Sequence, residues 1–452
     1  MLVFDTICAL ATPKAKSALA LVRLSGEKSF PILSHMIHKD IKTIEANHAY
    51  FVRLYQDKNN PKTFLDEAVI VAYKGPKSYT GFDSVDFSLH GSPLVVENVL
   101  SALVSLGARR AERGEFSAQA YYNGKMDLLK AEGINDLINA TSKRALEIAT
   151  KTLSQENTKI VTALKNDLLS DLATLEYYVE NEYTEGEANN LPEDLHKVAL
   201  DLEEKENELG TLIEKTKKAN REYNGFTVTI AGEPNVGKST LLNAILGEDK
   251  AIVSPIPGTT RDVVEGEKEI DGLLFRFKDT AGLRHTDDLV ENLGIERSYE
   301  TMKKADLILL ASDSGFTDID QNQEVQAILK EKPHIKIATK KDINKNQKEA
   351  DIAICSKTDD LGPLIALMKK KLNIEQKEES EFLGKREEEY LISIRDQIQK
   401  AHQALLDTGL IDITSDTLRE AISLINDLMG NSKAETMEDI YATLFSKFCL
   451  GK

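Results

Sequence analysis

A run of glycine, lysine and serine at residues 232–239 is the first part of the sequence that suggests chemistry. Its order is Gly-Glu-Pro-Asn-Val-Gly-Lys-Ser, so Lys238 and Ser239 directly follow the second glycine. In a loop of this pattern the backbone N–H groups surround phosphates, the lysine reaches the outer phosphates, and the serine hydroxyl holds Mg²⁺. The run therefore predicts a site for a nucleoside triphosphate.

A strand and a helix must flank this loop if its amides are to converge, and the sequence predicts both. Residues 226–231 form a β-branched, apolar run that is typical of a buried strand. Residues 239–246 predict a helix with three apolar side chains on one face, ending at Gly247. The positive end of that helix dipole favours bound phosphate.

Two polar stretches further on predict loops that sense the γ-phosphate. Residues 258–262 read Gly-Thr-Thr-Arg-Asp, and residues 279–282, at the end of a predicted strand, read Asp-Thr-Ala-Gly. The Asp279 carboxylate would hold the Mg²⁺ shell, and the glycine amide would approach the γ-phosphate. Either Thr259 or Thr260 would complete the magnesium shell with the serine of the first loop, and we expect Thr260.

Residues 339–342, Thr-Lys-Lys-Asp, predict the loop that selects the base. Asp342 can accept two hydrogen bonds from the N1–H and N2–H₂ edge of guanine, which adenine does not offer, and the Lys340 stem can cover the ring. Residues 355–357, Cys-Ser-Lys, would close the other side. The usual first residue of the motif is Asn, so Thr339 predicts a weaker hold on the base. Taken in order, the four motifs indicate a GTPase.

The group that positions the attacking water is less clear from the residues. Leu283 occupies a position where many GTPases have a glutamine, and its side chain has no hydrogen-bonding group. Asp287, Asp288 and Glu291 follow, and each carboxylate is a candidate.

The remainder of the chain predicts a multidomain protein. The first 118 residues mix short apolar runs with a helical stretch at 93–106, which suggests a compact α+β domain. Apolar positions at three- and four-residue spacing predict long helices over 160–179, 195–217 and 391–405. Helices on both sides suggest that the nucleotide domain is inserted into a helical one; two independent helical segments are the alternative.

Composition excludes some functions. The 452-residue chain has 57 basic and 74 acidic residues, a net charge of −17, which makes it a poor non-specific nucleic-acid binder. No apolar run reaches the roughly 18 residues of a membrane span, so we expect a cytoplasmic protein without a membrane partner. Three widely separated cysteines, Cys8, Cys355 and Cys449, predict reduced thiols.

These motifs, and others along the whole chain, resemble the tRNA uridine-modification GTPase family MnmE, also called TrmE. The final Phe-Cys-Leu-Gly-Lys is the most specific of them. The remaining matching stretches are 5–7, 11–13, 23–26, 107–109, 114–116, 123–128 and 258–262.

The resemblance implies an architecture of three kinds of domain. An N-terminal α+β folate-binding and dimerisation domain would span residues 1–118. A helical domain would be built from residues 119–220 and 379–452, and a Ras-like P-loop GTPase domain at 221–378 would be inserted between them.

The resemblance also implies a reaction and partners. With a flavin-dependent partner, MnmG (GidA), the family modifies C5 of the wobble uridine, position 34, of certain tRNAs. A reduced folate, 5-formyl- or methylene-tetrahydrofolate, supplies the one-carbon unit. The family works as a homodimer, which we expect to form a heterotetramer with its partner, and potassium stimulates its GTPase by permitting dimerisation of the nucleotide domains.

Site residues can be carried over by position. K⁺ would be bound by Asn235, Ser254, Ile256 and Thr259, and Mg²⁺ by Ser239 and Thr260. Glu291 matches the family's water-orienting glutamate, and Arg23, Lys125 and Lys452 match its folate positions. The full set expected to contact GTP is Asn235, Val236, Gly237, Lys238, Ser239, Thr240, Ser254, Pro255, Ile256, Pro257, Gly258, Thr259, Asp279, Thr280, Ala281, Gly282, Thr339, Lys340, Asp342, Ser356 and Lys357.

One departure weakens the folate expectation. Phe82 stands where the family usually has a glutamate, which removes a carboxylate that would bind the pterin ring. Asp83 is a possible substitute. Cys449 would lie near the one-carbon unit, but a small buried hydrophobe is the simpler interpretation.

Two other functions stay open at this point. A GTP-dependent RNA or ribosome-assembly switch would need an RNA-binding module, and the sequence has no KH-like glycine loop. A scaffold that has lost its folate chemistry is the other alternative.

Overall fold

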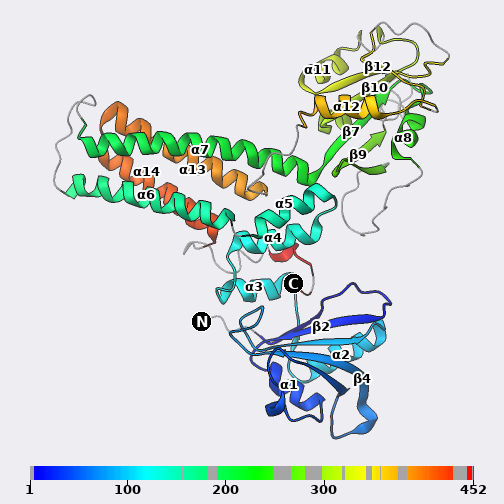
Figure 1. Ribbon diagram of the computed structural model, residues 1–452, viewed down its shortest axis with the longest axis vertical. Coiled ribbons are helices and arrows are strands. Elements are labelled where there is room, and N and C mark those ends of the chain that lie inside the picture. Colours follow the sequence, from blue (N-terminus) through cyan, green and yellow to red (C-terminus); the bar gives the residue numbers. More distant parts are fainter. Residues whose placement is uncertain are drawn as a thin grey trace. The chain divides into compact units, whose positions relative to one another are not determined.

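The computed structural model describes residues 5–154, 156–180, 191–247, 266–279, 298–317, 321–342, 349–356, 358–374, 384–430, 445–449 and 451. The chain separates into two compact units. The first contains Met1–Ile138, Thr152–Glu206 and Tyr390–Lys452, and the second contains Asn139–Lys151 and Asn207–Glu389. Both strands and long helices are present, so the mixed, multidomain fold class is confirmed (Figure 1).

A six-stranded sheet of order β3-β4-β5-β2-β1-β6 forms the N-terminal part of the first unit. All neighbours are antiparallel except β1 and β6. Two helices cover one face, because buried residues alternate along the strands and pack on them. The elements are β1 Ile7–Leu10, β2 Leu19–Ser25, α1 Ser29–Met36, η1 Ile41–Thr43, β3 Ala49–Tyr55, η2 Pro61–Thr63, β4 Phe64–Tyr73, β5 Ser84–His90, α2 Pro93–Ser105 and β6 Arg109–Arg110.

Helices form the rest of the first unit. The predicted stripe at 391–405 is confirmed, because all five of its apolar residues are buried on α13. α6 packs against α14, where Lys165 donates to Asn426 at 2.7 Å and Arg419 pairs with Glu176 at 2.9 Å. The elements are α3 Glu115–Tyr122, α4 Leu128–Asn139, α6 Glu156–Glu180, α7 Glu193–Asn224, α13 Lys385–Thr408, α14 Ile411–Met429 and η4 Phe445–Lys447. Two of these helices are divided between the units: α7 belongs to the first unit up to Glu206, and α13 from Tyr390.

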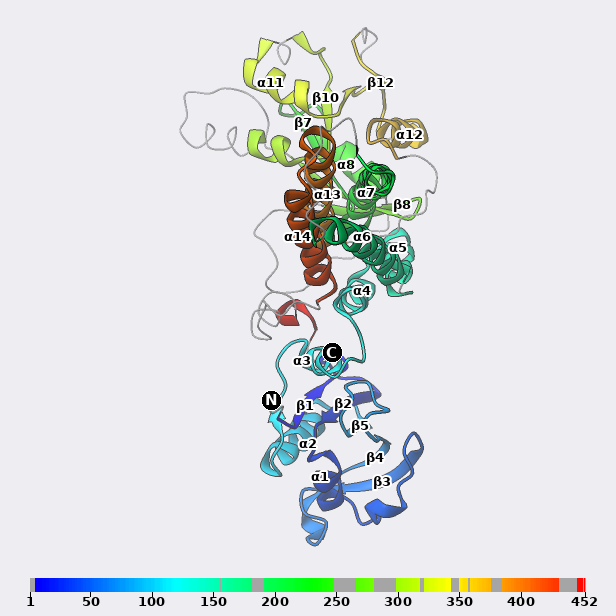
Figure 2. The same cartoon turned by 90° about the vertical axis from the view of Figure 1, so that its left-hand side faces the viewer.

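A second six-stranded sheet, of order β12-β11-β10-β7-β9-β8, forms most of the second unit (Figure 2). Only β8 is antiparallel to its neighbour. Helices α8 and α12 pack on one face and α11 on the other. The elements are α5 Lys143–Leu153, β7 Phe226–Gly232, α8 Lys238–Leu246, β8 Gly266–Ile270, β9 Leu273–Asp279, β10 Leu307–Ser312, α11 Gln323–Glu331, β11 His334–Ala338, β12 Ile352–Ala353 and α12 Gly362–Lys371.

The strand order fixes where a ligand can bind. From β7 the chain continues to β8 and β9 on one side and then to β10 on the other, so the order reverses beside β7. In open α/β sheets, ligands bind at the carboxyl ends of the strands at such a point. The register places Gly232 beside Ala311, and Asp279 beside Ile230, at this edge.

None of the described helices is long and apolar enough to cross a bilayer.

Candidate nucleotide site and its relatives

The phosphate loop, residues 232–239, has the backbone that its glycines allow. Gly232, Asn235 and Gly237 have φ values of 153°, 63° and 99°. A Cβ added at Gly232 would lie 2.1 Å from the carbonyl oxygen of Ala311, so only glycine fits between β7 and β10. The predicted strand, loop and helix start are confirmed, because β7 ends at Gly232 and α8 begins at Lys238.

Lys238 places a cation inside this loop. Its side chain is buried, and Nζ donates to the carbonyl oxygens of Gly232 at 3.1 Å and Glu233 at 2.9 Å. Ser239 and Thr240 lie exposed on the first turn of α8. A buried ammonium at a helix start, where the first-turn N–H groups have no acceptor within the helix, is an environment suited to phosphate.

The base loop, residues 339–342, is bonded directly to the phosphate loop. Thr339 is 2% exposed, and its hydroxyl donates to the carbonyl oxygens of Val236 at 2.6 Å and Ser312 at 3.2 Å. Lys340 Nζ donates to the Asn235 carbonyl at 2.9 Å and to Asp313 Oδ2 at 2.6 Å. The two predicted motifs therefore form one site, although 103 residues separate Thr339 from Val236.

Asp359 joins a third segment to the base loop, a connection that no sequence motif predicted. Its Oδ2 accepts from the N–H of Cys355 at 3.0 Å and lies 3.8 Å from Nζ of Lys341. Asp342, the predicted guanine-selecting residue, is exposed. Asp313 and Asp359 support the site without belonging to any motif, so only the fold reveals them.

Other predicted residues lie outside the described part of the chain. β9 ends at Asp279, whose backbone lies beside Ile230 of β7, two residues before the phosphate loop. Among the described residues no group of three or more His, Cys, Asp or Glu could hold a metal ion. The residues outside the description are Ser254, Pro255, Ile256, Pro257, Gly258, Thr259, Thr260, Thr280, Ala281, Gly282, Glu291, Lys357 and Lys452.

Arg23, the first predicted folate residue, is already paired. Its Nε and terminal nitrogen donate to Asp86 at 2.9 and 3.1 Å, and its guanidinium lies 5.5 Å from the centre of the Tyr79 ring. Burial lowers the pKa of Arg23, but the hydrogen bonds and charge of Asp86 outweigh burial, and the pKa stays above its usual value. A folate carboxylate would have to share this guanidinium with Asp86.

The other folate candidates differ in their surroundings. Lys125 is exposed beyond α3. Asp83, the possible substitute for the missing glutamate, accepts a hydrogen bond from the N–H of Gly75 at 2.9 Å through Oδ1. Its second oxygen is the one that a pterin would have to use.

A cavity of about 550 Å³ lies in the N-terminal part, and its lining includes neither Arg23 nor Lys125. Cys8, Arg110 and Cys449 contribute to its wall. Burial raises the pKa of Cys8 to about 11, so this thiol stays protonated. Cys449 is exposed, which contradicts the interpretation of this residue as a small buried hydrophobe.

Comparison with known proteins gives matches over the whole chain. A family model described as the N-terminus of the GTP-binding protein TrmE matches residues 6–125, and one described as a 50S ribosome-binding GTPase matches residues 227–340. Proteins named tRNA modification GTPase MnmE also match. The Thermotoga petrophila protein is 36% identical over 469 residues, covering 99% of this chain and 100% of that protein. The Mycoplasma mycoides protein is 35% identical over 472 residues, covering 100% of both.

Solved structures of GTPases match part of the chain. An Era variant from Aquifex aeolicus bound to GDP and AlF4⁻ is 28% identical, with a TM-score of 0.26, and covers 38% of this chain and 66% of that chain. The G domain of FeoB from T. maritima is also 28% identical, with a TM-score of 0.23, and covers 33% of this chain and 97% of that one. At these TM-scores the likeness adds no argument, and the conclusion rests on the full-length relatives: the chain belongs to the tRNA modification GTPase MnmE family.

Proposed function

We propose that this chain is a potassium-stimulated GTPase that acts with the flavoprotein MnmG on certain tRNAs. Together they would modify C5 of the wobble uridine at position 34, with a reduced folate as the one-carbon source. The observation that carries the proposal is the direct bonding of a phosphate loop to a guanine-selecting loop in a chain of this family. The cytoplasm is the proposed location.

The proposed domains follow the family pattern. Residues 1–118 would bind folate and dimerise, residues 119–220 and 379–452 would form the helical domain, and residues 221–378 would hydrolyse GTP. The homodimer would join its partner as a heterotetramer. The match of the TrmE N-terminal model to residues 6–125 supports the first assignment.

In the proposed hydrolysis, GTP binds with its phosphates on the phosphate loop and its base against Asp342. Ser239 and Thr260 would hold Mg²⁺, which neutralises phosphate charge when bound. Asn235, with Ser254, Ile256 and Thr259, would hold K⁺, and Glu291 would orient the attacking water. Asn235 suits its role because it is exposed on the phosphate loop and its own carbonyl is fixed by Lys340.

GTP turnover in equimolar K⁺ and Na⁺ tests the cation site. We expect faster turnover in K⁺, and we expect Asn235→Ala to remove the difference while GTP affinity changes little. Equal rates in the two salts would mean that Asn235 does not hold a cation. Glu291→Ala should lower kcat and leave the nucleotide Kd nearly unchanged; unchanged turnover would return the role to Asp287 or Asp288.

Calorimetry with 5-formyl-tetrahydrofolate tests the folate assignment. Arg23→Ala and Lys125→Ala should each weaken binding, and Lys14→Ala, at the rim of the 550 Å³ cavity, discriminates between sites. If only the Lys14 variant loses affinity, the folate lies in the cavity and not beside Arg23. Wobble-uridine analysis of tRNA from cells that lack this chain tests the modification itself.

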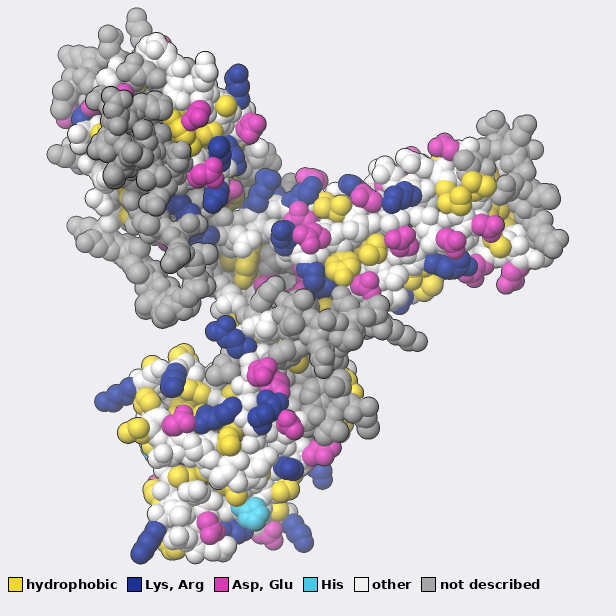
Figure 3. Space-filling model, turned by 180° about the vertical axis from the view of Figure 1, so that it is seen from behind, with side chains coloured by type: hydrophobic (Ala, Val, Ile, Leu, Met, Phe, Trp, Pro, Cys, Tyr) yellow, Lys and Arg dark blue, Asp and Glu magenta, His cyan; other side chains and the backbone are white. Residues whose placement is uncertain are grey.

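A GTP-dependent ribosome-assembly switch is the second candidate, favoured by the match of residues 227–340 to the 50S ribosome-binding model. Such a switch needs a basic surface for RNA. On the face shown in Figure 3, the described Lys and Arg side chains alternate with Asp and Glu along the helices. The full-length MnmE relatives make tRNA modification the better-supported function.

A further inference from the structure

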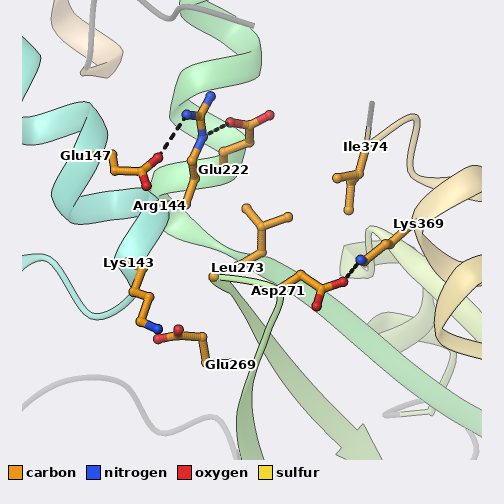
Figure 4. A pocket seen from close by; sticks show the side chains of 10 residues that line it. Lys143, Arg144, Glu147, Glu222, Glu269, Asp271, Leu273, Lys369 and Ile374 are labelled. Atoms are coloured by element: carbon orange, nitrogen blue, oxygen red, sulfur yellow. Dashed lines mark hydrogen bonds and ion pairs between the residues drawn. The ribbon is translucent and has the colours of Figure 1, made fainter. Parts of the chain in front are cut away.

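The contact between the β8–β9 hairpin and α5 lies within the second unit and involves none of the residues predicted to contact GTP. It borders a cavity of about 990 Å³ whose walls come from α5, the end of α7, the hairpin and α12 (Figure 4). Cations and anions alternate around this cavity, and Lys143 points toward Glu269 in Figure 4. Its charged residues are Lys143, Arg144, Glu147, Glu222, Glu269, Asp271 and Lys369.

The hairpin connects the two loops that are predicted to sense the γ-phosphate. β8 begins at Gly266, directly after residues 248–265, and β9 ends at Asp279, directly before residues 280–297. A strand is stiff along its length, so a displacement at either end of the hairpin reaches its turn at Asp271 and Gly272.

The start of α5 is bonded to that turn. The N–H of Arg144 donates to the carbonyl oxygen of Gly272 at 2.9 Å, and the N–H of Ala145 donates to Oγ of Ser142 at 3.1 Å. The first turn of a helix has no internal acceptors for its N–H groups, so the hairpin carbonyl takes the place of one. Gly272 has φ +87°, and an added Cβ would lie 3.6 Å from Cβ of Lys143.

The Arg144 side chain fixes α5 to the end of α7. Its Nε donates to Oε2 of Glu222 at 2.7 Å, and NH1 lies 3.3 Å from Glu147. The side chains of Arg144 and Glu222 are only 15% and 6% exposed. Removing one partner of such a pair leaves a largely buried charge without compensation, so this contact holds α5 firmly to α7.

Additional contacts make the hairpin, α5 and the end of α7 one packed body. Ile148 of α5 packs with Ala219 and Tyr223 of α7. On β9, the Arg276 guanidinium donates to the carbonyl oxygen of Asn224, the last residue of α7. A displaced hairpin would therefore carry both helices with it.

We propose that Arg144 is a positioning residue that makes α5 and the end of α7 follow the β8–β9 hairpin, so that these helices respond to the bound nucleotide. The proposal rests on the binding of GTP at the phosphate loop. Both helices continue along the chain into segments of the first unit, so this is a route by which hydrolysis can act beyond the GTPase domain.

Hydrogen exchange of the α5 peptide in the full chain tests this proposal. With Mg²⁺ and either GDP or a non-hydrolysable GTP analogue, we expect exchange in α5 to differ by about threefold or more between the two states. Arg144→Ala should abolish that difference and change the GDP Kd by less than about twofold. Arg144→Lys should retain part of it, because a cation still faces Glu222.

Lys303→Ala is the matched control, since it removes an exposed ion pair with Glu300 elsewhere in the same unit and should keep the wild-type difference. If Arg144→Ala does not fold, as judged by stoichiometric GDP binding, Glu222→Gln replaces it and should also lose the difference. The proposal is overturned if a folded variant keeps the wild-type difference, or if wild type binds both nucleotides and shows none. Failure of wild type to bind GTP would instead overturn the proposed function.

Discussion

Replacing Thr339 with Val tests whether the bonding of the two loops prepares the nucleotide site. Val has nearly the same shape as Thr but lacks the hydroxyl that donates to Val236 and Ser312. The Thr339 N–H still donates to Ser312 at 2.8 Å and Lys340 still donates to the Asn235 carbonyl at 2.9 Å, so only the hydroxyl's hydrogen bond to the phosphate loop is lost.

The expected loss of nucleotide affinity follows from the burial of the hydrogen bond between Thr339 and Val236. Thr339 is 2% exposed, so the Val236 carbonyl loses its donor in a place that water hardly reaches. A buried polar group left unpaired costs about 1–3 kcal/mol. With only the Lys340–Asn235 bond left between the loops, part of their ordering must be supplied by the bound nucleotide, and a cost of about 1–2 kcal/mol lowers affinity by roughly 5- to 30-fold.

Titration with a fluorescent GDP analogue, together with its dissociation rate, measures this effect. Thr339→Ser retains the hydroxyl and should stay near wild type. Thr339→Asn restores the residue usual in this motif, which has more hydrogen-bonding groups, and should bind at least as tightly as wild type. If the Val variant binds GDP within about twofold of wild type while remaining folded, this hydrogen bond does not prepare the site.

Two more changes test other parts of the account. Gly232→Ala should abolish nucleotide binding in a binding titration, because its Cβ would lie 2.1 Å from the Ala311 carbonyl at a φ of +153°; near-normal binding would show that β10 gives way. Asp171 on α6 has its pKa raised to about 6 by burial and then by the charges of Asp201 and Asp167. The folded state therefore binds a proton on the Asp171 carboxyl more tightly than the unfolded chain does. The protonated carboxyl contributes to stability below about pH 4, and this contribution is lost as pH rises through 6. Asp171→Asn should thus stabilise the protein by about 2–3 kcal/mol at pH 7.5 and far less at pH 4.5, as measured by urea unfolding, and an equal effect at both pH values would contradict this.

Local patterns predicted the parts of the fold that depend on neighbouring residues. The strand before the phosphate loop and the helix after it lie where the apolar run and the glycines indicate. The Asp271-Gly272 dipeptide does form the turn of a hairpin, with φ values of 52° and 87° that few other residue pairs adopt. α7 extends to Asn224, beyond the predicted 217, because Ala219 and Tyr223 on its last turns pack against Ile148 of α5.

Contacts between distant segments could not be predicted in this way. From the sequence, Thr339 predicts only weaker binding of the base than the usual Asn. Its hydrogen bond to Val236 depends on the placement of β11 beside β10 and of β10 beside β7. The Arg23–Asp86 pair depends on the register of β2 and β5. Nothing in the sequence of α5 marks it as part of the GTPase unit, because its partners Gly272 and Glu222 are far along the chain.

The selection of guanine by Asp342 is the central claim, and competitive binding of GTP and ATP to wild type and to Asp342→Ala measures it directly. Two charge-assisted hydrogen bonds of about 1.5–3 kcal/mol each predict that wild type prefers GTP by about a hundredfold or more. The variant should lose most of that preference by binding GTP more weakly, with ATP affinity unchanged. Wild type that binds ATP as tightly as GTP, or a variant that keeps the preference, would contradict the account.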